Sequence, residues 1–115
     1  MMLSSTPWPV ALGALLLTLG AARADTVAAR CDIYPKGSDK ASAVVSCTFS
    51  QRQGYVRIER ADGTSHDLSP VGSSAGRYVD QDGRPAYRQS GLGRQGQIYR
   101  LAKESVYVYW DTAGL

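Results

Sequence analysis

The sequence predicts an all-β domain, either a small antiparallel β-barrel or a sandwich of about seven or eight short strands with one disulfide. Short runs rich in β-branched and aromatic residues recur along the chain, with turn residues between them. Two Asp-Gly pairs, Asp62-Gly63 and Asp82-Gly83, fall between such runs and favour hairpins. At 115 residues the chain has room for one domain.

The N-terminus has the features of a secretion signal. Val10 to Leu19 is an apolar run too short to cross a bilayer as a helix, and Ala22-Arg23-Ala24 has the form of a signal peptidase site. We therefore expect residues 1–24 to be removed and residues 25–115 to form a single β domain in the periplasm or outside the cell. The alternative is a buried N-terminal helix. A lipid anchor at Cys31 is disfavoured, because Arg30 stands where lipid attachment requires a small residue, so we expect no membrane anchor.

The charge of the chain argues against a nucleic-acid partner. The formal net charge is +3, and removal of Arg23 with the signal lowers it by one. The arginines are scattered rather than clustered, which is typical of a solvated basic surface. We expect no nucleic acid and no cofactor.

Cys31 and Cys47 are the two cysteines of the chain, and both follow the predicted signal. An even count in an oxidising compartment predicts a disulfide between them. Closing a loop of this length stabilises a fold by about 3 kcal/mol. A metal site is not expected, because the two thiols are far apart in sequence and His66 is the one histidine.

The first half of the predicted domain contains four candidate strands. Residues 25–30 read as a loose lead or a first edge strand, and Cys31 to Tyr34 alternate weakly before Pro35. Ala43 to Ser50 are rich in β-branched residues, and Tyr55 to Arg60 alternate apolar and polar side chains. A type I′ turn at Asp62-Gly63 would then return the chain into residues 65–68.

The second half contains an open loop followed by four further strands. Residues 71–76 form the loop, Arg77 to Val79 start a strand, and residues 80–85 supply the next turn. Strands are expected at residues 86–89, 97–102 and 105–110, with glycine-rich residues 91–96 as a loop between the first two. In the last strand Val106, Val108 and Trp110 share one face. About a dozen apolar side chains then suffice for the core.

No motif predicts catalysis, and we expect the protein not to be an enzyme. Residues 91–96 match the dinucleotide-binding pattern of glycines, but a strand-like segment follows where that mechanism requires a helix. His66 and Asp67 are neighbours on a predicted strand, so their side chains point to opposite faces and cannot orient one another. Arginines and tyrosines interleave along the second half, where they serve either as binding anchors or as packing residues.

One stretch resembles the membrane-bound and periplasmic inhibitors of c-type lysozyme. The resemblance rests on Leu68 and Val71, on residues 74–78 with the sequence SAGRY, on the Asp-Gly turn, and on residues 87–91 with the sequence YRQSG. Relative to the family pattern, the glycine of the first motif lies one position later, at Gly76. Arg88 and Ser90 stand where the family has an aromatic residue and a lysine.

The resemblance implies an exported eight-stranded barrel that inhibits lysozyme by inserting a serine-containing loop into the active-site cleft. It gives Ser74 the role of the plug, with Tyr78 fixing the loop and Ser90 lying beside the cleft. A neutral hydroxyl can donate a hydrogen bond to a catalytic carboxylate without repulsion. The partner-binding residues expected on this basis are Ser73, Ser74, Arg77, Tyr78, Tyr87, Arg88 and Ser90.

Two other functions are consistent with the sequence. The first is an envelope structural or small-ligand module that uses the arginine and tyrosine side chains to bind an acidic saccharide or peptide. The second is a small hydrolase, which requires two carboxylates or a serine and His66 to converge in the fold.

Overall fold

The computed structural model describes residues 26–110, so the predicted signal at residues 1–24 lies outside the described residues. Eight β-strands follow one another along this part of the chain. They are β1 (Thr26–Pro35), β2 (Ala43–Arg52), β3 (Tyr55–Arg60), β4 (Ser65–Pro70), β5 (Arg77–Val79), β6 (Pro85–Gln89), β7 (Gly96–Arg100) and β8 (Glu104–Tyr109).

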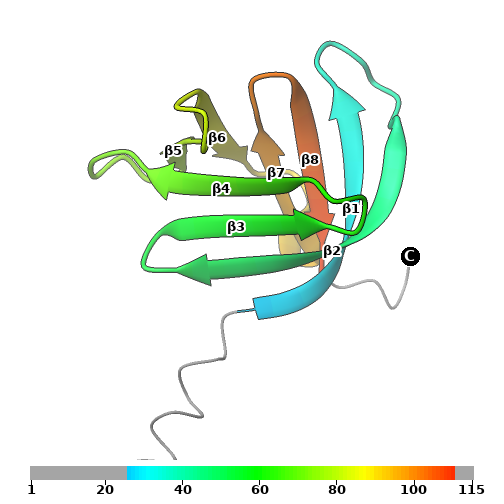
Figure 1. Ribbon diagram of the computed structural model, residues 1–115, viewed down its shortest axis with the longest axis horizontal. Coiled ribbons are helices and arrows are strands. Elements are labelled where there is room, and N and C mark those ends of the chain that lie inside the picture. Colours follow the sequence, from blue (N-terminus) through cyan, green and yellow to red (C-terminus); the bar gives the residue numbers. More distant parts are fainter. Residues whose placement is uncertain (1–25, 111–115) are drawn as a thin grey trace, which may run out of the picture.

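The strands form a closed antiparallel barrel in which each strand pairs with its neighbours in sequence (Figure 1). The ring closes between β1 and β8, from the pair Arg30 and Tyr109 to the pair Pro35 and Glu104. This confirms the all-β prediction and decides for the barrel over the sandwich. The helical structure within residues 26–110 is one 3-10 turn, Gly93–Gln95. Within these residues, no helix is both long enough and apolar enough to cross a bilayer.

The first strand is longer than the sequence pattern indicates. Of the two interpretations of residues 25–30, a loose lead or a first edge strand, the strand is correct from Thr26 onward, because β1 runs without interruption from Thr26 to Pro35. Its N-terminal part pairs with β2 from the partners Thr26 and Ser50, and its C-terminal part pairs with both β2 and β8. Hydrogen bonds to two neighbouring strands therefore stabilise β1, although the alternation of its side chains is too weak to predict its full length.

The core lies inside the barrel and is built by the inward positions of alternating strands. Tyr99, Val106 and Val108 are fully buried. Twelve residues form the central cluster, as the sequence predicts: Cys31, Ile33, Cys47, Phe49, Val56, Ile58, Leu68, Tyr78, Ala86, Tyr99, Val106 and Val108. The predicted disulfide between Cys31 and Cys47 is present in this cluster and joins β1 to β2.

The hairpin turns differ from the prediction in one respect. The type I′ turn, which needs positive φ at both central residues, occurs at Gln53 (φ 52°) and Gly54 (φ 87°), between β2 and β3. At Asp62-Gly63 only the glycine has positive φ, so the prediction of a type I′ turn there is wrong. The Asp62 carboxylate accepts the backbone N–H of Thr64, and Arg60 binds the same carboxylate. These bonds favour the turn that is observed over a type I′ turn.

The outer face of β1 and β8 is covered by aromatic side chains. The rings of Tyr34 and Tyr107 lie 4.5 Å apart between their centroids, and the Arg30 guanidinium lies 4.5 Å from the centre of the Tyr109 ring. The alternation in β8 therefore gives this strand one face toward the core and one face on the outside of the barrel. Val106 and Val108 point into the barrel, and the tyrosines pack outside it.

Because the barrel is closed and meandering, alternate connections lie at the same end. One end carries the β2–β3 turn, the β4–β5 loop and the β6–β7 connection. The opposite end, which we call the barrel mouth, carries the connections β1–β2, β3–β4, β5–β6 and β7–β8 (Figure 1).

Candidate functional site

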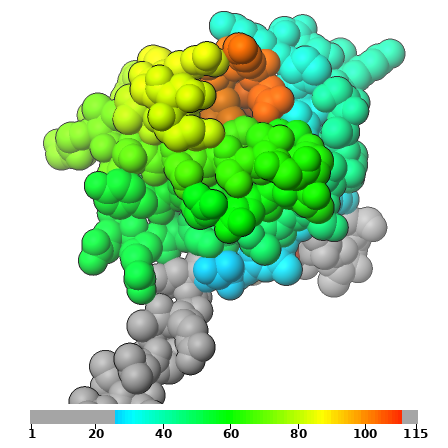
Figure 2. Space-filling view, viewed as in Figure 1, coloured from blue at the N-terminus to red at the C-terminus, as the bar shows by residue number. Residues whose placement is uncertain are grey.

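The most prominent feature of the first end is the β4–β5 connection, residues 71–76, which we call the serine loop. It protrudes from the barrel (Figure 1), and the space-filling view shows this yellow-green segment standing out from the surface around it (Figure 2). Ser73 and Ser74 are exposed at its tip. Their hydroxyls are accordingly accessible to a partner.

The serine loop is held by backbone hydrogen bonds at its base. The N–H of Val71 donates to the carbonyl of Arg77 at 3.0 Å, and the N–H of Arg77 donates to the carbonyl of Ser74 at 3.3 Å. Gly76 has φ of 79°, a conformation that favours glycine, and a Cβ there would make only ordinary contacts with Arg88. The glycine is therefore required for the backbone geometry of the loop and not for space.

Arg88 of β6 fastens the loop to the barrel. Its backbone N–H donates to the Gly76 carbonyl at 2.8 Å, and its guanidinium donates to the Tyr78 hydroxyl at 3.2 Å. Arg88 pairs in register with Tyr99, so its side chain occupies an inward position at this end of the barrel. Arg88 thus acts as a brace between β6 and the loop.

Tyr78 differs from the other predicted partner-binding residues because it is buried, with 5 % exposure. Its ring lies edge-on to that of Tyr99, with the centroids 6.1 Å apart. Of the two roles expected for Tyr78, contact with a partner is contradicted by this burial, and the role of fixing the loop remains. Burial also raises the pKa of Tyr99, whose protonated hydroxyl donates to Gln97 at 2.6 Å.

The remaining predicted residues do not form one compact patch. Ser90 is exposed directly after β6, at the same end as the serine loop. Arg77 and Tyr87 are exposed partners in register on β5 and β6, so they lie on the outer wall of the barrel below the loop. The structure therefore brings Ser73, Ser74 and Ser90 to one end and leaves the two wall residues at its flank.

Two exposed apolar residues, one in the serine loop and one near its base, are absent from the predicted partner-binding set. Val71 begins the loop with 41 % exposure, and Tyr55 opens β3 with 56 % exposure. The β2–β3 turn lies next to the loop base, since a Cβ on Gly54 would lie 3.4 Å from the Pro70 ring. The alternation of β3 already places Tyr55 on the face opposite Val56, and that signal could have identified it.

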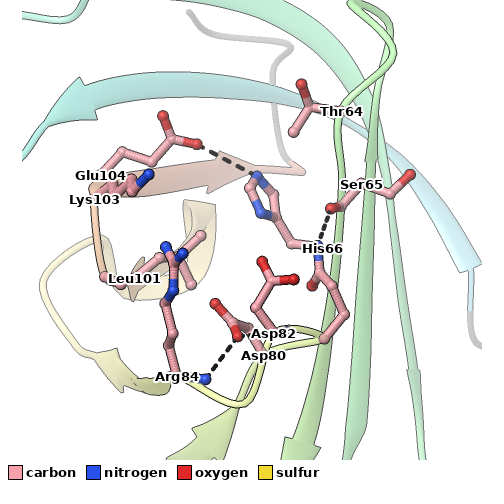
Figure 3. A pocket seen from close by; sticks show the side chains of 11 residues that line it. Thr64, Ser65, His66, Asp80, Asp82, Arg84, Leu101, Lys103 and Glu104 are labelled. Carbon is pink, nitrogen blue, oxygen red and sulfur yellow. Dashed lines mark hydrogen bonds and ion pairs between the residues drawn. The ribbon is translucent and has the colours of Figure 1, made fainter.

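A cluster of charged side chains around Arg60 lies at the barrel mouth, and Figure 3 shows two of its members, His66 and Glu104. The Arg60 guanidinium donates to Glu104 at 2.9 Å and to Asp62 at 2.6 Å, and its side chain is 8 % exposed. His66 Nε2 lies 3.7 Å from the same Glu104 oxygen. Burial is the largest cause that lowers the pKa of His66. The negative charge of Glu104 acts in the opposite direction, and the positive charge of Arg60 adds to the lowering.

A pocket of about 300 Å³ opens above this cluster, with His66, Asp80, Arg84 and Glu104 among its lining residues (Figure 3). The Asp80 carboxylate accepts the backbone N–H groups of Asp82 and Arg84, both at 2.9 Å, and so caps the β5–β6 turn. Carboxylates do converge here, because Asp82 also lines the pocket, but those of Asp80 and Glu104 are already bonded.

The requirements of a hydrolytic or metal site are met only in part. No serine hydroxyl bonds to His66 among the hydrogen bonds of residues 26–110, and Ser65 points away from the pocket (Figure 3). Asp67 lies on the outer face and pairs with Arg57, as the alternation of the strand predicts. In the described part of the chain, no group of three or more His, Cys, Asp or Glu side chains is arranged to hold a metal ion.

Comparisons with known proteins add no relative. No protein-family model matches the chain, and neither a curated protein nor a solved structure matches it. The disulfide within a small barrel is consistent with an oxidising, extracellular compartment.

Proposed function

We propose that this is an exported, non-enzymatic binding protein that grips a protein partner with the serine loop, and that the partner is a c-type lysozyme. The observation that carries the proposal is the pair of exposed hydroxyls, Ser73 and Ser74, on a protruding loop with a fixed base. A glycosidase of this kind works with two carboxyl groups in a cleft. Serine hydroxyls can donate hydrogen bonds to such groups.

The bonding of the loop base favours tight binding. A loop that is already ordered loses less conformational entropy when it enters a cleft. The bonds from Arg88 to Gly76 and Tyr78 supply that order without occupying the hydroxyls at the tip. Val71 and Tyr55 add exposed apolar surface at the flank, which a cleft wall can cover.

The absence of catalysis in this proposal rests on the state of the acidic groups. Glu104 is bonded to Arg60, and Asp80 caps a turn. A general acid or base must be able to exchange a proton with substrate, and both carboxylates are already engaged by donors of the protein. The proposal also places the mature chain, residues 25–115, in the periplasm or outside the cell after removal of residues 1–24.

The test is a lysozyme lysis assay with the purified oxidised protein and two charge variants. Ser74→Asp places a carboxylate against the catalytic acids and should weaken inhibition at least about tenfold, because like charges brought together cost several kcal/mol. Ser46→Asp adds the same charge at an exposed position of β2 and should leave inhibition unchanged. Lack of inhibition by the unaltered protein at about 10 μM contradicts the choice of lysozyme as the partner.

A pull-down from the exported fraction separates the wider proposal from the lysozyme form of it. The unaltered protein should capture a partner that Ser74→Asp fails to capture, while Ser46→Asp retains it. Equal capture by all three proteins would mean that the serine loop is not the binding element.

A further inference from the structure

A second candidate site lies on the outer wall, away from the tip of the serine loop. It is a groove of about 600 Å³ between the β1–β2 connection and the outer faces of β6, β7 and β8, and we call it the arginine groove. This volume is within the range of small-molecule sites. The side chains that matter for its chemistry are Lys36, Tyr87, Gln89, Arg100, Glu104 and Ser105.

Arg100 is fixed in the groove by neutral acceptors. Its Nε donates to the Gln89 side-chain oxygen at 2.9 Å, and its Nη1 donates to the Ser105 hydroxyl at 2.9 Å. These bonds hold the plane of the guanidinium, but neither acceptor carries a charge that would cancel it. The positive charge is thus positioned and left unneutralised.

Three other arginines in residues 26–110 differ from Arg100 in this respect. Arg30, Arg57 and Arg60 each form an ion pair with a carboxylate, whereas the ion pairs found in this part of the chain include none to Arg100. Glu104 also lines the arginine groove, but its carboxylate is bound by Arg60 at 2.9 Å. The bond to Arg60 reduces the repulsion between this acid and an anion in the groove.

The walls of the groove supply a second cation and an aromatic ring. Tyr87 pairs in register with Arg100 on the neighbouring strand, and its side chain is half exposed. Lys36 lies on the opposite wall, and its backbone N–H donates to the Lys103 carbonyl at 3.0 Å, which ties that wall to the β7–β8 turn. Both walls are thus held in place by backbone pairing.

We propose that the arginine groove binds a saccharide that carries a carboxylate, such as a hexuronate unit of an acidic glycan. Because Nε and Nη1 of Arg100 already donate to Gln89 and Ser105, Nη2 is the nitrogen that can donate to a carboxylate. Lys36 adds a second positive charge. The half-exposed ring of Tyr87 offers a flat apolar surface for the C–H face of a sugar. This activity is independent of lysozyme inhibition, because none of the serine loop lines the groove.

The experiment titrates the purified oxidised protein with trigalacturonate, neutral galactotriose and inorganic phosphate, followed by backbone NMR shifts and calorimetry. Trigalacturonate should shift the amides of Lys36, Tyr87 and Arg100 in a saturable way. Its affinity should fall several-fold as salt rises from about 0.05 to 0.5 M, because salt screens exposed charges.

Arg100→Gln should reduce trigalacturonate affinity at least about tenfold, and Arg94→Gln, an exposed arginine on the 3-10 turn, should leave it unchanged. Tyr87→Ala tests the groove without touching the Arg100 bonds and should also weaken binding. The proposal is overturned by no shifts at millimolar trigalacturonate, by equal binding of galactotriose, or by equal binding of phosphate, which would indicate a general anion site.

Discussion

At the scale of single residues, His66 at the barrel mouth makes the free energy of unfolding depend on pH. It is buried beside Glu104 and Arg60, and burial lowers its pKa below the ordinary value near 6.5. Asp62 and Asp80 also act on it, and both raise the pKa against the effect of burial. His66 in the unfolded chain therefore binds a proton just below about pH 6.5, whereas in the native state it binds one only at lower pH.

The sign of the effect on stability follows from this difference in proton binding. Below about pH 6.5 the unfolded state holds more protons, so the free energy of unfolding decreases as pH falls until the lowered native pKa is passed. His66→Gln removes this contribution, so urea unfolding from pH 7.5 to 5.5 should show a smaller loss in the variant. Lys36→Gln should keep the slope of the unaltered protein, and identical slopes for His66→Gln would contradict the assignment.

Gly96 is a residue for which space, and not conformation, excludes a side chain. A Cβ there would lie 2.8 Å from the Val108 carbonyl carbon and nearer still to its oxygen, both of which are backbone atoms of the neighbouring strand. Gly96→Ala should therefore lower the free energy of unfolding by at least about 2 kcal/mol, as overpacking does. Gly83→Ala, which meets open space at φ of 78°, should cost only about 1 kcal/mol in the same urea titration.

At the scale of elements, the brace between β6 and the serine loop decides how well the loop is ordered. Tyr78→Phe removes the hydroxyl that accepts from Arg88, and the loss should be about 1 to 2 kcal/mol because the donor is charged. Partner dissociation should become faster while association changes little. Tyr87→Phe alters a half-exposed ring on the outer wall and should change stability by less than about 0.5 kcal/mol. Equal losses in the two variants would contradict the role of the brace.

The strands themselves could be predicted where apolar and polar residues alternate cleanly. Val56 and Ile58 point inward in β3 as the pattern indicates, and the same alternation places Arg60 inward. The ion pair between Arg60 and Glu104 could not be predicted from the sequence, because the two residues come together only when the strands pair in register and the barrel closes. Turn type was misjudged at Asp62, because side-chain bonds to the carboxylate compete with the local preference for positive φ.

At the scale of the whole molecule, the disulfide contributes stability that can be removed without deleting a side chain. Cys31 and Cys47 are 16 residues apart, and a loop of that length gives about 3 kcal/mol. Reduction should lower the free energy of unfolding by that amount, a large share for a domain of this size. Urea unfolding with and without reductant measures it, and an unchanged midpoint with both thiols titratable would contradict the prediction.

The candidate sites were predictable to different degrees. The serine loop follows from glycine and serine between two strands, and its exposure agrees with that expectation. The burial of Tyr78 and the bracing role of Arg88 depend on which positions face inward in strands too short to show a pattern. The arginine groove needs residues from three strands in one register, so local sequence could not place Arg100 beside Gln89 and Ser105.

The closure of the ring by β8 also bears on aggregation. Residues 105–110, with the sequence SVYVYW, combine high β-propensity with no charged side chain, which is the composition of segments that form fibrils when unpaired. In the native barrel β1 and β7 occupy both edges of this strand. Because the cysteine bridge ties β1 to β2, formation of the bridge helps to keep one of these covering strands in place and so disfavours self-assembly of the chain.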